Sequence, residues 1–477
     1  MSQHAKPMHK RVTGVFTNPA KFFLVFSVFF GALLVFITPP MQVPDEQSHF
    51  FQAYAVSDLH FVPKKFEKNG ATYYGAELPS SVYMAVNEFL GNVPGNPGIN
   101  FNIDLYKTYI DQPLDVSVKQ YVGGTTYSPI VYIPQAIGIT IGKIFNSSPL
   151  VMIWLGRLTN LVAWVLILYF AIKILPFAKW AMVVLALNPM TVFLSASLSA
   201  DVVTVALAFL FFSLIASEFA KKEQVSKKRL LLILATLSLI VLTKPTNILF
   251  ALLLFAIPWR NFKTKRNFVL FCLGAVMAAL TVGLLWYSAT SEINQVTAQL
   301  QRPGMGISPS EQLDGIINNP LHYAKTILLN YVIIPPGYPG DAVLRTFFGV
   351  FGWLDTEIPL WTIIMYTIGL FLALIFQFGR GLFLSAYQKS ILAATFILLF
   401  VGNITALYLY YTPVGSSFIS GVQGRYFIVG SILLLGIFTA RKKILDISEK
   451  LLAVILGSTM LIVLGMTVIR IFIRYYI

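Results

Sequence analysis

Long apolar segments that hold almost no charged residues recur along the chain, and they constrain its fold more than any other feature. A helix needs about 20 mostly apolar residues to cross the hydrocarbon core of a bilayer. Hydrophobic residues make up 56% of the chain and charged residues 12%, about half the charged share of a soluble domain. We therefore predict an all-α, polytopic integral membrane protein. The segments that qualify are Phe22–Thr38, Leu150–Leu175, Val202–Ala216, Phe268–Tyr287, Trp361–Phe378, Ile391–Tyr410, Phe427–Thr439 and Leu451–Val468.

The charged residues between these segments predict an orientation. Basic residues gather in five short stretches, at 6–21, 221–229, 260–266, 380–389 and 441–443. The positive-inside rule places all five in the cytoplasm, and it explains the net charge of +15 without nucleic acid as a partner. Of the 20 acidic residues, nine lie between Pro40 and Tyr127 and six between Thr290 and Pro359. We expect these two polar stretches to be extracytoplasmic.

This orientation predicts about eleven transmembrane helices, provided that two ambiguous segments are assigned consistently. Segment 128–145 is predicted to be an interfacial or re-entrant helix, because crossing would place the basic cluster at 221–229 outside. Segment 230–258 is predicted to be a helical hairpin that breaks at Lys244-Pro245-Thr246-Asn247. The predicted regions are a basic cytoplasmic N-terminus (1–21), the first transmembrane helix (22–39), a first extracytoplasmic loop with interfacial helices (40–149), transmembrane helices (150–289), a second long extracytoplasmic loop (290–358) and C-terminal transmembrane helices (359–477).

Two carboxylates and an imidazole follow the first apolar segment directly. Pro44 is a natural first residue for a helix, on which Asp45 and His49 would share a face because they are four residues apart, and Glu46 and His49 three apart. Such a group could form a general base with its orienting partner. It could also supply some of the ligands of a divalent cation such as Mg or Mn. Alternatively, Asp45 and Glu46 only cap the helix and offset its dipole.

Two basic residues near the predicted outer surface are candidates for binding phosphate. Arg425 lies in a glycine-containing turn with Gln423 and Tyr426, and its guanidinium can hold phosphate oxygens in a bidentate fork. Lys244 lies in the apolar hairpin, where insertion of a lysine costs about 2.5–3.5 kcal/mol. A phosphate partner would offset that cost. The alternative for both residues is a side chain that extends to the membrane surface.

Four further residues are predicted to lie toward the same side. Arg157, Asp201 and Asp355 each lie near the end of an apolar segment, and a structural ion pair is the simplest role for any one of them. Tyr127 begins the predicted interfacial helix, where an aromatic ring either stacks on a sugar or belongs to the interfacial belt. The convergence of all these groups on one side predicts a functional site there.

Three sequence motifs resemble the signatures of a known family. The run from Pro39-Pro40 through Pro44-Asp45-Glu46 to His49-Phe50 is similar to the opening signature of the bacterial membrane-protein family "domain of unknown function 2142". Gly352-Trp353-Leu354-Asp355 and the segment 421–427 resemble two later signatures, and the likeness extends from about Phe22 to about Lys443. This family is similar in layout to the GT-C superfamily of glycosyltransferases, which use sugars linked to polyprenyl phosphate.

The resemblance implies roles for individual residues. Asp45 matches the catalytic acidic residue after the first span, and Arg425 and Lys244 occupy places where GT-C enzymes hold the lipid phosphate. One motif differs, because the lysine or histidine before paired prolines in those enzymes is here only Tyr127-Ser128-Pro129.

We therefore predict a glycosyltransferase of the bacterial plasma membrane that acts on its extracytoplasmic face. It would move a sugar from a polyprenyl-phosphate donor to an envelope glycan or glycolipid. Asp45, helped by Glu46 or a bound cation, would be the base. The predicted substrate-binding residues are Arg425, Lys244, His49, Tyr127, Arg157, Asp201, Asp355, Gln423 and Tyr426. The alternatives are a transporter or flippase of a lipid-linked glycan, and a non-catalytic component of envelope assembly.

Overall fold

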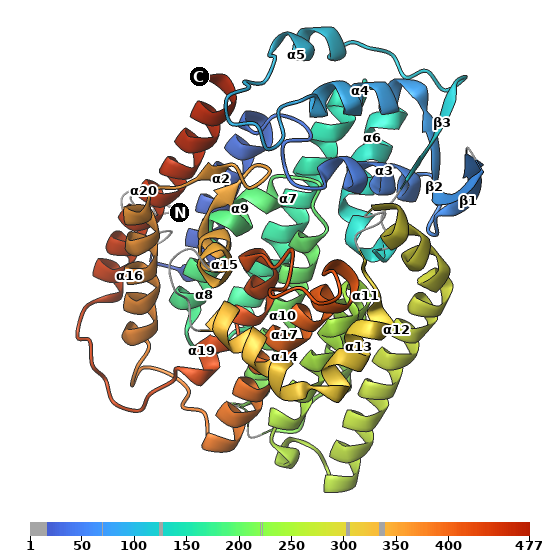
Figure 1. The fold of residues 1–477 in the computed structure, drawn as a ribbon. Helices are drawn as coiled ribbons and strands as arrows, with labels where there is room; N and C mark the ends of the chain where they lie inside the picture. Colours follow the sequence, from blue (N-terminus) through green and yellow to red (C-terminus); the bar gives the residue numbers. More distant parts are fainter. Residues whose placement is uncertain are drawn as a thin grey trace, which may run out of the picture.

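The computed structural model describes residues 17–68, 70–123, 127–219, 221, 223–301, 306–332 and 339–477. It is a bundle of helices with a small sheet and several short helices gathered at one end (Figure 1). Among these described residues, six helices are long and apolar enough to cross a membrane. They are α2 (Pro19–Ile37), α7 (Pro149–Ile174), α10 (Asp201–Phe219), α12 (Lys265–Gln301), α17 (Ala386–Tyr411) and α20 (Glu449–Tyr476).

The predicted count of eleven spans is not confirmed, because several apolar segments form short or broken helices. Within the described residues, three more apolar helical segments fall below the length of the six, at Pro129–Ile144, Pro245–Ala256 and Leu360–Phe376 (α16). The apolar stretch 179–195 divides into α8 (Lys179–Ala186) and α9 (Pro189–Ser195), since Asn188 caps a new helix at Pro189. The stretch 427–439 likewise contains only α18 (Ile428–Ser431) and α19 (Leu434–Ile437).

The region predicted as the first outer loop forms a compact layer at one end of the bundle. Its helices are α3 (Glu46–Ser57), α4 (Ser80–Leu90), α5 (Asp104–Tyr109), the 3-10 turn η1 (Pro129–Tyr132) and α6 (Ile133–Ile144). The strands β1 (Lys64–Lys68), β2 (Ala71–Pro79) and β3 (Lys119–Gly123) make an antiparallel sheet in the order β1-β2-β3. This sheet is the main exception to the all-α prediction. Helix α6 forms where the interfacial or re-entrant helix was predicted, and it packs on α7 and α3.

The second predicted outer loop is also largely helical. After α12 it contains α13 (Pro309–Asn318), α14 (Pro320–Ile327), a π-helical turn at Leu328–Val332 and α15 (Pro339–Phe348). The two-residue strands β4 (Val350–Phe351) and β5 (Thr356–Glu357) pair with each other before α16 begins. Helix α15 packs on the 3-10 turn η5 (Gly424–Phe427), which carries the predicted phosphate-binding motif.

Helix α10 is the most enclosed of the six long helices. In its most apolar window 89% of the residues are buried, whereas α12 and α17 bury 17% and 22%. A helix that is apolar on all sides is stable only when other elements surround it, and α7, α11 (Lys227–Thr243) and α18 pack on α10. The first residue of this central helix is Asp201, so the fold brings a carboxylate to the end of the bundle core.

The hairpin predicted at 230–258 breaks at the predicted position. Helix α11 ends at Thr243, and the 3-10 segment η2 (Pro245–Ala256) begins two residues later. Between them Lys244 is extended, with φ −153° and ψ 135°, the conformation favoured before a proline. Helix α17 packs on η2. The break turns the Lys244 side chain toward the end of α10.

Candidate functional site

Four charged side chains from four separate elements meet beside the end of α10. Lys244 Nζ lies 2.7 Å from Asp201 Oδ1, and Arg425 Nε lies 4.0 Å from Asp201 Oδ2. On the other side of the guanidinium, Arg425 Nη2 lies 3.6 Å from Asp45 Oδ2. The four residues were all predicted as site residues from the sequence, and the fold brings them together across more than 370 positions of the chain. We call Asp45, Asp201, Lys244 and Arg425 the charged cluster.

Two tyrosine rings lie beside the cations of the charged cluster. The ammonium of Lys244 lies 5.0 Å from the ring centre of Tyr426 and 5.9 Å from that of Tyr127. The Arg425 guanidinium lies 5.3 Å from the Tyr426 ring. Cations this close to the face of an aromatic ring are attracted to it. Tyr127 and Tyr426, both predicted to bind substrate, therefore lie together beside the cations of the charged cluster.

Asp45 is held in a left-handed backbone conformation and does not cap helix α3. Its φ is 62° and its ψ is 9°, and its side chain makes no capping hydrogen bond. Aspartate tolerates this conformation better than most residues, although such a backbone still carries strain. The Asp45 side chain is 59% exposed. The alternative in which Asp45 caps the helix is therefore wrong, and its carboxylate is accessible from solvent.

His49 is buried close enough to the charged cluster to interact with its charges, and a tyrosine hydroxyl orients its ring. Its Nδ1 lies 2.8 Å from the hydroxyl of Tyr132, and its ring lies 6.0 Å from that of Tyr127. Burial lowers the pKa of the His49 imidazole, against the charges of Asp45 and Asp201, which raise it. The imidazole is therefore neutral near pH 7, and its contact with Tyr132 fixes its position.

Glu46 points away from Asp45 and into the protein interior, where it pairs with Arg157. Both side chains are fully buried, and Arg157 Nη2 lies 2.6 Å from Glu46 Oε2. The two Glu46 oxygens also accept hydrogen bonds from the backbone N–H groups of Met41 and Leu198. Arg157 donates further to the carbonyls of Val35, Thr38 and Pro39. We therefore assign Glu46 and Arg157 to holding the segment before Asp45 in place.

Asp355 has a similar supporting position, away from the charged cluster. Arg474, near the end of α20, lies 2.8 Å from Asp355, and each side chain is 5% exposed. The guanidinium also donates to the carbonyls of Val93, Asn96 and Ile99, so it ties the last helix to the first predicted outer loop. Gln423, unlike Asp355, lies next to the charged cluster, because it lines a small hollow together with Arg425, Pro44 and Gly352.

Three buried arginines differ in how many hydrogen bonds their guanidinium groups donate to the rest of the protein. Arg157 and Arg474 each donate five hydrogen bonds, at 2.6–3.0 Å and 2.8–3.2 Å respectively. Arg425 is only 8% exposed, yet within the described part of the chain its hydrogen bonding is limited to one contact of 3.5 Å, with the Tyr426 hydroxyl. No described residue accepts a hydrogen bond from its Nε. A buried guanidinium with unused donors is ready to bind an anion.

The predicted cation site does not form from the three residues proposed for it. In the described ranges, no group of three or more histidine, cysteine or acidic side chains lies together in a way that could hold a metal ion. The reason is the turn at Asp45, which leaves that carboxylate exposed while Glu46 enters the buried pair with Arg157. Asp45, Glu46 and His49 therefore do not share a metal-binding face.

A family model described as "Predicted membrane protein (DUF2142)" matches residues 26–435 of the chain. The chain belongs to the DUF2142 family. No curated protein and no solved structure matches it. The match covers most of the chain and includes the charged cluster and the Glu46–Arg157 pair, whereas Arg474 lies beyond its end. The likeness to GT-C enzymes remains a prediction.

Two residues of this DUF2142 protein were not predicted from its sequence. Arg474 was missed, although it is one of only two arginines in the last apolar helix, a signal for a buried partner. The contact of the Tyr132 hydroxyl with His49 was not predicted either, because it depends on the packing of η1 against α3. Arg474 supports the fold around the site, and Tyr132 orients a side chain within it.

Proposed function

We propose that this protein is a membrane glycosyltransferase that transfers a sugar from a polyprenyl-phosphate donor on the extracytoplasmic face of the bacterial plasma membrane. The observation that carries the proposal is the buried Arg425 guanidinium with unused hydrogen-bond donors. Its contacts with Asp45 and Asp201 in the charged cluster are 3.6 and 4.0 Å and its contact with Tyr426 is 3.5 Å, all beyond the usual length of a charge-assisted hydrogen bond. A phosphate oxygen would supply the acceptors that the protein lacks at this position.

Lys244 supports the same assignment. Its contact with Asp201 uses one of its three N–H donors, and the two tyrosine rings surround the remainder of the ammonium. Asp201 therefore holds the lysine in position beside Arg425 without consuming all of its capacity. Two cations next to each other neutralise a phosphate better than one, and they stabilise the negative charge that develops on a phosphate leaving group.

Asp45 is suited to the role of base in this reaction. Its exposed carboxylate lies 3.6 Å from Arg425, so an acceptor hydroxyl could bind between solvent and the phosphate site. Asp45 would take the proton of that hydroxyl as the acceptor oxygen forms a bond to the anomeric carbon. The bond between that carbon and the phosphate oxygen would break, and polyprenyl phosphate would leave with the electron pair. A positioned base contributes typically 10²–10⁴-fold to the rate.

The first test is release of free polyprenyl phosphate by the purified protein in nanodiscs. A panel of polyprenyl-phosphate sugars would be offered with crude envelope glycan as acceptor. We expect release by the wild type and a loss of about 10²-fold or more in Asp45→Asn. Asparagine also tolerates the left-handed conformation, so folding should survive. The matched control is Asp104→Asn, which removes an exposed carboxylate outside the charged cluster.

Two outcomes would contradict the proposal. Release at the wild-type rate from Asp45→Asn would exclude Asp45 as the base. Absence of release from every donor, by a protein that binds the lipids and moves them between leaflets of a vesicle, would favour the transporter or flippase instead.

A further inference from the structure

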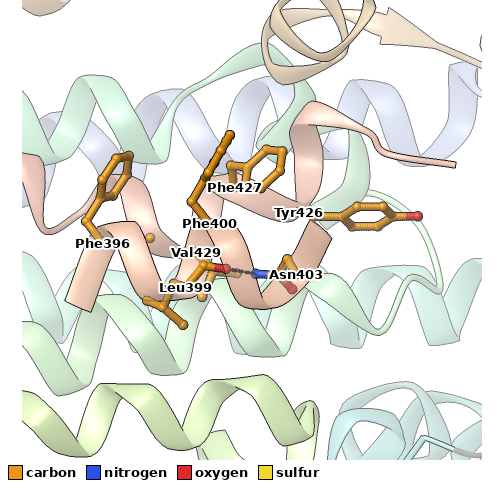
Figure 2. A pocket seen from close by; sticks show the side chains of 8 residues that line it. Phe396, Leu399, Phe400, Asn403, Tyr426, Phe427 and Val429 are labelled. Carbon is orange, nitrogen blue, oxygen red and sulfur yellow. Dashed lines mark hydrogen bonds between the residues drawn. The ribbon is translucent and has the colours of Figure 1, made fainter. Parts of the chain in front are cut away.

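A shallow apolar groove opens directly beside the charged cluster. Its walls come from α17 and from the segment η5–α18, and Figure 2 shows Phe396 at one end, Tyr426 at the other, and Phe400 and Phe427 between them. The rings of Phe400 and Phe427 lie 4.7 Å apart. The lining residues are Phe396, Leu399, Phe400, Asn403, Tyr426, Phe427, Val429 and Gly430.

The groove and the charged cluster share a residue, so they form one continuous surface. Tyr426 lines the groove, and its ring also lies 5.0 Å from Lys244 and 5.3 Å from Arg425. Asn403 adds a polar group to the lining, and Thr246, two residues after Lys244, contacts its side-chain oxygen at 3.4 Å. Apart from the hydroxyl of Tyr426, the rest of the lining is apolar. A molecule with a charged head and one hydrocarbon chain matches this arrangement.

The direction of the groove fits a lipid of the outer leaflet. Its residues on α17 are spaced i, i+3, i+4 and i+7, so they follow one helix face for about 10 Å. In the predicted topology α17 runs from a cytoplasmic start near Lys389 to an outer end near Tyr411. Asn403 therefore lies closer to the outer surface than Phe396. Only 22% of the most apolar window of α17 is buried among the described residues, so part of this helix surface is left uncovered by the protein.

We propose that this groove binds the phosphate-proximal isoprene units of the polyprenyl phosphate donor. The inference rests on the proposed function, because it places the phosphate of the same lipid on Arg425 and Lys244. The chain would then run from the charged cluster past Tyr426 and Phe400 toward Phe396 and the bilayer interior. The groove runs between one helix face and one turn, and a glycerophospholipid would have to place two chains there.

Gly430 offers a way to fill the groove without touching the charged cluster. A Cβ atom at Gly430 would meet Phe396 at 3.6 Å and Leu399 at 3.8 Å, which are ordinary contacts. Gly430→Ala should therefore fold normally and serve as the matched control. Gly430→Leu would extend its side chain into the space that the isoprene units need.

The experiment measures binding of three probes to the full-length protein in detergent: farnesyl phosphate, inorganic phosphate and phosphatidic acid. We expect Gly430→Leu to weaken farnesyl phosphate binding by about tenfold while inorganic phosphate binding is unchanged. Gly430→Ala should behave like the wild type. Arg425→Gln should weaken the binding of both farnesyl phosphate and inorganic phosphate. If Gly430→Leu does not fold, Phe400→Ala gives the second measurement, because it removes a wall of the groove and should also weaken only farnesyl phosphate.

The outcomes separate this inference from the proposed function. Equal binding of farnesyl phosphate by Gly430→Leu and the wild type, with a loss in Arg425→Gln, would overturn the groove and leave the phosphate site intact. Phosphatidic acid that binds as tightly as farnesyl phosphate and responds equally to Gly430→Leu would overturn the isoprenoid assignment. No binding of any phosphate by the wild type would overturn the proposed function itself.

Discussion

Replacement of Arg157 by glutamine should destabilise the protein far more than replacement of Arg425, and this contrast tests the central argument about Arg425. In Arg157→Gln the fully buried Glu46 carboxylate loses its counter-ion, and three backbone carbonyls lose their donors. Removal of one partner of a buried ion pair costs about 3–5 kcal/mol. That is a large share of a typical free energy of unfolding of about 5–15 kcal/mol. We expect strong destabilisation in this variant.

In Arg425→Gln the expected change in stability is much smaller. Asp201 retains Lys244 at 2.7 Å, and Asp45 is 59% exposed, so no buried carboxylate is left unpaired. The variant loses one hydrogen bond of 3.5 Å and two long ion pairs of 3.6 and 4.0 Å, and it removes a poorly satisfied buried charge. We therefore expect its free energy of unfolding to stay within about 1 kcal/mol of the wild type.

The assay is thermal unfolding in detergent at one fixed heating rate, with and without farnesyl phosphate. A fixed rate is needed because large proteins often unfold irreversibly. Ligand at 100 times its dissociation constant should stabilise the wild type by about 2.7 kcal/mol. Arg425→Gln should lose this stabilisation by ligand, while its unfolding midpoint without ligand should stay close to that of the wild type. Destabilisation of Arg425→Gln as large as that of Arg157→Gln would show that Arg425 is a structural residue and would refute the reasoning.

Two further predictions follow from the site and its support. Burial lowers the pKa of His49 in the folded protein below its ordinary value of 6.5. As the pH falls, the imidazole is therefore protonated in the unfolded chain before it is protonated in the folded protein. The contribution of His49 to stability is complete above pH 6.5 and is lost as the pH falls below that value. Midpoints measured from pH 7.5 to 5 should fall in the wild type and fall less in His49→Gln, and identical profiles would contradict a buried neutral imidazole. Arg474→Gln leaves Asp355 buried without its partner and should cost about 3–5 kcal/mol. Hydrogen exchange should then rise at residues 93–101, and unchanged protection there would show that Arg474 does not hold this segment.

The sequence predicted the membership of the site better than the roles within it. Asp45, Asp201, Lys244 and Arg425 were all selected because charged groups are rare beside apolar segments, and the fold brings them together. The partners of Arg157 and Asp355 were not predicted, because each pair joins elements more than 100 residues apart. The spacing of Glu46 and His49 suggested a shared function with Asp45, yet the turn at Asp45 sends Glu46 into the core.

The sequence by itself determined that this protein has many apolar helices and where its hairpin breaks, because the length of apolar runs and the position of a proline are local properties. Only the tertiary structure decided which of three buried arginines keeps unused hydrogen-bond donors among the described residues. Hydrogen bonding of a guanidinium depends on carbonyls and carboxylates supplied by distant segments, so no local pattern distinguishes Arg425 from Arg157 and Arg474. That difference, set by packing, separates the predicted phosphate site from the arginines that support the fold.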